Sequence, residues 1–158
     1  MHESTPATID HEHGTVTRTV LIRAPRSAVW EALTTPELIS EWFELPTTFD
    51  RFEEGAAGVF AWEARGDIPL ELAEIQEPTV FAWRWGTAGR PMDDAHSTLV
   101  RFTLEEVAEG TLLVVVESGF ATLAGDDDYR RTRLDENRGG WDIELDNLAA
   151  FLERQDSV

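Results

Sequence analysis

The chain has 158 residues, an apolar fraction of 42% and a formal net charge of −18, which together predict one acidic domain with one core. Its 31 acidic residues against 13 basic ones argue against nucleic-acid binding, because such a surface repels phosphate backbones. No cysteine is present, which excludes disulfides, thiolate metal ligands and cysteine nucleophiles.

The first segment is polar and has no periodic pattern, so we expect residues 1–14 to form a flexible N-terminal tail. It also lacks the basic and apolar regions of a secretory signal. No later run approaches the roughly 20 apolar residues that span a bilayer, and we therefore expect a cytoplasmic protein without a membrane span. Two histidines, His11 and His13, make a poor site in such a tail, so no metal is expected. Residues 15–158 are expected to form a single domain.

A strand and two short helices are predicted after the tail. Residues 15–23 are rich in β-branched side chains, which indicates a strand, and Pro25 ends it. An apolar stripe after Pro25 predicts one short helix. The threonine, proline and glutamate of residues 34–37 predict the start of a second.

Short strands at regular spacing follow, with no helix between them. We expect strands at residues 47–52, 59–63, 69–75, 80–85, 98–105 and 111–120. Strands in this arrangement are typical of an antiparallel meander. With the strand at residues 15–23, the sheet should have about six or seven strands.

A long helix is predicted at the C-terminal end. Asp126 to Asp128 favour its start, because carboxylates suit the positive N-terminal end of a helix. Four apolar residues fall on one helical face: Trp141, Leu145, Leu148 and Leu152. Such a stripe needs an apolar partner, which the inner face of the sheet provides. The sequence therefore predicts an α+β helix-grip fold, in which a curved antiparallel sheet wraps the long helix. We expect Gly139 and Gly140 to let this helix bend.

Three stretches of the chain, in order, resemble a known family. Residues 17–43 match its strand, Ala-Pro turn and tryptophan-containing helices; residues 71–85 match its hairpin and aromatic strand; and residues 139–153 match its terminal helix. The chain thus resembles START-like (SRPBCC, Bet v 1-type helix-grip) domains, and specifically the bacterial relatives of the Aha1 activator of Hsp90 ATPase.

The resemblance implies a cavity between the sheet and the terminal helix that takes a small apolar ligand. It does not imply one activity, because the fold hosts binding proteins, cyclases and co-chaperone domains. Eukaryotic Aha1 has a separate N-terminal domain where this chain has only a short tail, so an Hsp90-type chaperone partner is not expected. Helix-grip relatives often dimerise, which leaves a homodimer open.

Aromatic side chains dominate the expected inner layer. Phe60 and Trp62 share strand phase, as do Trp83 and Trp85, so each pair points to one side of the sheet. The expected cavity-lining residues are Trp42, Phe43, Phe60, Trp62, Trp83, Trp85, Phe102, Phe120, Trp141 and Leu145. In the alternative interpretation, these rings fill the interior and leave little void.

Glu117 is the best candidate for a catalytic residue, because it interrupts the apolar run of the last strand. Pointing inward, its carboxylate could act as an acid or base, or hold a polar group of a ligand. Otherwise it lies at the strand end in water, or pairs with an arginine. Arg84 and Glu71 are its candidate partners, whereas His96 is expected to be a surface histidine in a loop.

Three functions follow from these features. We expect first the binding of a small hydrophobic ligand, without catalysis and without a cofactor. The alternatives are a cyclase- or hydrolase-type enzyme that uses Glu117, and a module that interacts with a chaperone through its surface.

Overall fold

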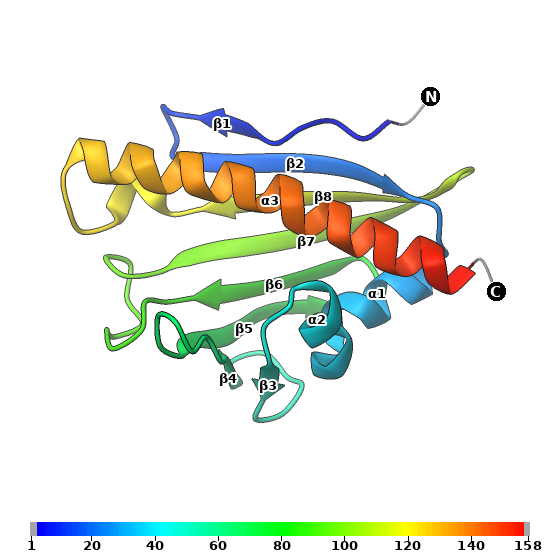
Figure 1. Cartoon of the computed structure of the whole chain (residues 1–158), viewed down its shortest axis with the longest axis horizontal. Coiled ribbons are helices and arrows are strands. Elements are labelled where there is room, and N and C mark those ends of the chain that lie inside the picture. Colours follow the sequence, from blue (N-terminus) through cyan, green and yellow to red (C-terminus); the bar gives the residue numbers. More distant parts are fainter. Residues whose placement is uncertain (1–2, 157–158) are drawn as a thin grey trace.

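A curved, eight-stranded antiparallel sheet wraps one long helix in the computed structural model, which describes residues 3–156 (Figure 1). The strands are β1 (Thr8–Asp10), β2 (Thr15–Ile22), β3 (Thr47–Phe49), β4 (Ala57–Phe60), β5 (Ile68–Gln76), β6 (Val80–Trp85), β7 (Thr98–Val107) and β8 (Gly110–Ser118). The helices are α1 (Arg26–Thr34), α2 (Pro36–Trp42), the short 3-10 helix η1 (Phe120–Thr122) and α3 (Asp127–Asp156). The predicted α+β helix-grip fold is confirmed, with two short helices after the first long strand.

The sheet has one strand more than the six or seven expected, because part of residues 1–14 belongs to it. β1 pairs with β2 so that Ile9 lies opposite Val16, and Ala7 is buried. The amide of Ala7 also donates a hydrogen bond to Asp142 Oδ1 in α3 at 2.8 Å. This strand has three residues and a single apolar side chain, too short a pattern to be recognised in a sequence. Residues 1 and 2 of the expected tail lie outside the described residues.

The strand order is β1-β2-β8-β7-β6-β5-β4-β3, so the first long strand lies beside the last one. Arg18 in β2 pairs with Val115 in β8. Buried and partly exposed residues alternate along both strands, because successive side chains point to opposite faces. This alternation places Arg18 and Glu117 on the inner face, toward α3, among apolar neighbours.

α3 crosses the inner face of the sheet and packs chiefly against β2 (Figure 1). It is helical through both Gly139 and Gly140. The predicted apolar stripe is buried along its whole length and comprises Trp141, Leu145, Leu148 and Leu152. Burying each such side chain stabilises the fold by about 1.5–3 kcal/mol, so the stripe holds the helix on the sheet. No helix in the described part of the chain is long and apolar enough to cross a membrane.

Candidate functional site

A cavity of about 670 Å³ lies between α3 and the loops at one end of the sheet. Its walls come from the N-terminal half of α3, residues 43–45 after α2, the β4–β5 loop and the β6–β7 loop. Figure 1 shows both loops at the end of the sheet that the N-terminal half of α3 covers. The cavity therefore sits where the helix and the open end of the sheet meet.

Four of the ten aromatic and leucine residues expected in the cavity wall do line it: Phe43, Trp62, Trp85 and Trp141. The other six are at most 2% exposed and pack in the core: Trp42, Phe60, Trp83, Phe102, Phe120 and Leu145. The two groups are continuous, since Phe43 stacks on Phe60 with ring centroids 5.0 Å apart. The rings thus fill much of the interior and still leave a void at one end.

The indoles of Trp85 and Trp141 form a flat section of the cavity wall. Their ring centroids lie 5.8 Å apart with an interplanar angle of 27°. Phe43 meets Trp85 edge-on at 5.9 Å. Stacked and edge-on aromatic contacts of this kind add about 0.5–1.5 kcal/mol each beyond burial. The wall is therefore a packed structure rather than a set of loose side chains.

Glu117 lies behind this wall and is fully buried. Its Oε1 accepts hydrogen bonds from Trp141 Nε1 (2.9 Å) and Asn137 Nδ2 (2.9 Å). Its Oε2 accepts from Trp85 Nε1 (2.9 Å) and Thr98 Oγ1 (2.5 Å). The carboxylate is thus neither in water nor paired with an arginine, and it fixes both indoles of the cavity wall.

The candidate partners of Glu117 lie elsewhere. Trp85 points inward, so its neighbour Arg84 points to the outer face, where its Nη1 lies 3.9 Å from Asp94 Oδ1. Glu71 pairs with Arg84 in the strand register and is exposed. Neither side chain is placed to act together with Glu117.

His96 is a partly exposed residue of the β6–β7 loop, as expected, and it also lines the cavity. Its Nδ1 lies 2.7 Å from Asp93 Oδ1, and its backbone oxygen accepts a hydrogen bond from the hydroxyl of Thr87 at 3.0 Å. The loop folds back over the end of the sheet because Ala124 N donates to the carbonyl of Ala95 at 2.8 Å. This bond joins the loop to the segment just before α3.

Three charged residues of α3, Arg133, Glu136 and Glu144, line the cavity and were not predicted from the sequence. Arg133 Nε and Glu144 Oε2 are buried and have no hydrogen-bond partner in the described part of the protein. The spacing of the lining residues could have indicated them in the sequence. Residues 133, 137, 140, 141 and 144 are separated by intervals such as three, four and seven, which places them on one face of a helix.

The carboxyl of Glu144 lies in an unusual environment for an acid. Burial, together with the smaller effect of the nearby Glu44 carboxylate, raises its pKa from the usual 4.5 to about 7. Glu44 itself lies in the cavity wall with a positive φ of 62°. One end of the cavity is therefore acidic. Across the described residues, no group of three or more possible ligands is placed to hold a metal ion.

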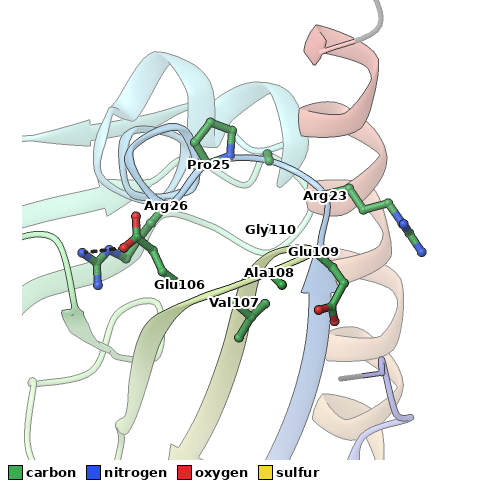
Figure 2. A pocket seen from close by; sticks show the side chains of 9 residues that line it. Arg23, Pro25, Arg26, Glu106, Val107, Ala108, Glu109 and Gly110 are labelled. Carbon is green, nitrogen blue, oxygen red and sulfur yellow. Dashed lines mark ion pairs between the residues drawn. The ribbon is translucent and has the colours of Figure 1, made fainter. Parts of the chain in front are cut away.

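A second hollow, of about 570 Å³, lies between the segment after β2 and the β7–β8 hairpin (Figure 2). Arg26 Nη2 lies 3.7 Å from Glu106 Oε2 in it, and Figure 2 shows Arg23 pointing away from this pair. None of the described residues that line this hollow is aromatic. It offers an apolar ligand little surface, so the cavity beside α3 is the better candidate site.

The fold and the aromatic cavity define a protein of the helix-grip class. The chain matches the family described as "Activator of Hsp90 ATPase homolog 1-like protein" over residues 23–153, and it belongs to this family. The resemblance to the bacterial relatives of Aha1 is thereby confirmed.

Solved structures of similar fold come from several bacteria. MLL2253 from Mesorhizobium loti is 25% identical, with a TM-score of 0.75 over 89% of this chain and 97% of that one. CalU16 from Micromonospora echinospora is 26% identical, with a TM-score of 0.65 over 87% of this chain and 73% of that one. DynU16, a protein of the dynemicin biosynthetic locus, is 24% identical, with a TM-score of 0.69 over 89% of this chain and 47% of that one. Among curated proteins, none matches the chain.

Proposed function

We propose that the protein binds a small hydrophobic ligand in the cavity beside α3. The observation that carries this proposal is the void of about 670 Å³ walled by four aromatic side chains: Phe43, Trp62, Trp85 and Trp141. Ligand pockets typically have volumes of about 300–1,000 Å³ and are lined by aromatic and apolar side chains with a few polar groups. The size of the cavity and its four aromatic side chains support this role, and the other lining residues include ten that are polar or charged.

The packing of the wall also supports binding. Trp85 and Trp141 are each held by a hydrogen bond to Glu117 and by stacking on one another. A wall that is rigid before the ligand arrives loses little side-chain entropy on binding. The site is thus preorganised for a flat apolar molecule.

The hydrogen bonds and the position of Glu117 favour binding over catalysis. Both of its oxygens already accept hydrogen bonds from side chains of the protein, and it lies behind the indoles rather than in the cavity wall. A general base must reach the proton that it removes, within hydrogen-bond distance or through one water. Glu117 is better suited to positioning the wall.

Native mass spectrometry of the protein as purified tests for a retained ligand. A complementary experiment titrates 8-anilinonaphthalene-1-sulfonate, a fluorescent probe with two aromatic groups and an anionic sulfonate, into the wild type and into two variants, Gly140→Leu and Gly139→Leu. Gly140 lines the cavity and Gly139 does not, and an added Cβ meets no atom within 4 Å at either glycine. We expect Gly140→Leu to fill part of the cavity and weaken probe binding by about tenfold or more, from the loss of buried apolar contact.

Gly139→Leu is the matched control, because it changes the same helix by the same side chain outside the cavity. It should bind the probe as the wild type does. Equal probe affinity in all three proteins, together with a bare mass under gentle conditions, would overturn the proposal.

A further inference from the structure

The cavity has two polar ends joined by an aromatic middle. Arg133 and Glu144 are eleven residues apart on α3, which corresponds to about 16 Å along the helix axis and nearly the same helical face. Between them on this face lie Asn137, Gly140 and Trp141, which also line the cavity. The two charged residues therefore mark the two ends of one elongated site.

The polar groups at the two ends have opposite hydrogen-bonding character. Arg133 Nε is a donor, and Glu144 Oε2 is a carboxyl oxygen; both are buried and unpartnered within the described residues. Most buried polar side-chain atoms in proteins have a partner, and each exception calls for an explanation. A ligand that bonds to both atoms supplies one. The described structure gives neither atom an alternative partner in the protein.

The charges around the Glu144 end agree with this polarity. Glu44 reinforces the negative charge at the Glu144 end. At the other end, Glu136 also lines the cavity one turn of α3 from Arg133, but it is exposed to solvent, whereas Arg133 Nε is buried. The buried, unpartnered Nε of Arg133 therefore assigns the hydrogen-bond acceptor to its end, and a hydrogen-bond donor suits the acidic end.

The geometry points to a specific ligand class: an elongated, flat aromatic molecule with a carboxylate at the Arg133 end and a hydroxyl or amino group at the Glu144 end. This inference rests on the proposed function and adds the polarity and the length of the ligand to it. Subtracting two hydrogen bonds of about 2.9 Å each from the axial separation of about 16 Å leaves roughly 10 Å for the length of the ligand. Two linked aromatic rings with one substituent at each end have about this length.

Three related compounds test the inference by isothermal titration calorimetry. The full probe is 4′-hydroxybiphenyl-4-carboxylic acid; biphenyl-4-carboxylic acid lacks the hydroxyl, and 4-hydroxybiphenyl lacks the carboxylate. We expect the full probe to bind at least tenfold more tightly than either partial one, because a hydrogen bond to a charged group commonly contributes a factor of ten or more.

Two variants assign each contact to one end of the cavity. Arg133→Met should weaken the two carboxylate-bearing probes about tenfold and leave 4-hydroxybiphenyl unchanged. Glu144→Met should weaken the two hydroxyl-bearing probes and leave biphenyl-4-carboxylic acid unchanged. Both variants should fold, because each removes a buried polar atom that has no protein partner to lose. Thermal unfolding of each variant verifies this before titration.

The outcomes separate this inference from the proposed function. If all three compounds bind with equal affinity to the wild type and both variants, or if the variants exchange their expected effects, the polarity is wrong and the binding site stands. If none of the three binds while 8-anilinonaphthalene-1-sulfonate distinguishes Gly140→Leu from Gly139→Leu, the ligand class is wrong. If neither these compounds nor that probe binds, both proposals fall.

Discussion

The indole of Trp141 donates a hydrogen bond to Glu117 Oε1 at 2.9 Å, which joins the last strand to the helix that closes the grip. Trp85 makes the equivalent bond to Glu117 Oε2, also at 2.9 Å. Both indoles line the cavity, whereas the carboxylate is fully buried behind them. One acidic side chain thus positions both indoles of the cavity wall and connects the sheet to the helix.

Replacing the carboxylate of Glu117 should destabilise the protein. Glu117→Leu leaves the donors of Trp141, Asn137 and Thr98 without their acceptor in the interior. Trp85 Nε1 keeps one acceptor, Thr98 Oγ1 at 2.9 Å. We expect a loss of about 3 kcal/mol in the free energy of unfolding, because each buried unpaired donor costs about 1–3 kcal/mol and relaxation recovers part. Urea unfolding followed by tryptophan fluorescence measures it. The exposed Glu105→Gln on β7 is the control and should change stability by less than about 0.5 kcal/mol. Unchanged stability in Glu117→Leu would contradict a structural role.

The position of Glu117 could be predicted in part from the sequence. Its phase in β8 matches that of the buried Leu113 and Val115, which supports the inward orientation, one of the alternatives that the sequence left open. Its partners could not be predicted, because Trp85 and Asn137 come from a distant strand and from α3, and strand phase carries no information on such contacts. Arg84, the expected partner, does not contact Glu117. It is adjacent to Trp85 in β6, and its side chain therefore points to the other face of the sheet.

The polar ends of the cavity were missed for a different physical reason. The apolar stripe of α3 was recognised by its leucines and continues toward the N-terminus with the buried Leu134, whereas Arg133 and Asn137 lie on the adjacent face of the helix. Charged residues on a helix usually indicate the solvated side. Here the β6–β7 loop covers that part of the helix, and no periodicity in the sequence reports how a loop folds. Glu144 became buried in the same way, beside residues 43–45 after α2.

Arg18 should be as important for the position of α3 as Glu117. Its guanidinium is buried, and it donates to the carbonyl oxygen of Asp142 (2.8 Å) and to Asp146 Oδ1 (2.8 Å). Arg18→Met keeps the apolar stem and removes these bonds, and we expect a loss of about 2–3 kcal/mol, measured by urea unfolding. The control is Arg131→Met, whose exposed ion pair with Asp128 contributes about 0.5 kcal/mol or less. Equal stability of the two variants would show that Arg18 does not anchor the helix.

The two glycines of α3 should be replaceable by alanine with a gain in stability. An added Cβ at Gly139 or Gly140 meets no atom within 4 Å, and both residues are helical. Glycine in a helix interior costs about 0.5–1 kcal/mol relative to alanine, so each variant should gain about that amount in thermal unfolding. Gly110→Ala is the opposite case and should lose stability, because its φ is +145° and the new Cβ would lie 2.3 Å from the carbonyl oxygen of Ile22. If alanine at Gly139 and Gly140 lowered the stability instead, this result would support the helix bend that the sequence suggested.

The stability of the protein should also depend on pH through Glu144. Its pKa of about 7 in the folded protein exceeds the usual 4.5, so between these values the folded state binds more protons than the unfolded state does. The stabilisation from this group is therefore complete below about pH 4.5 and is lost as the pH rises through about 7. Because the side chain is partly exposed, solvent screening reduces the effect to about 1–2 kcal/mol.

Glu144→Gln removes this titration and should abolish the corresponding slope. The measurement is the free energy of unfolding of wild type and variant from about pH 4 to about pH 8, since the difference between the two curves cancels the other titrating groups. The variant should be more stable than the wild type by about 1–2 kcal/mol near pH 8 and similar near pH 4. Glu44→Gln should give a smaller change of the same sign, because it removes the neighbouring negative charge and leaves Glu144 able to titrate. Parallel curves for wild type and Glu144→Gln would mean that the carboxyl is solvated in the folded protein, and the acidic end of the cavity would then be open to water.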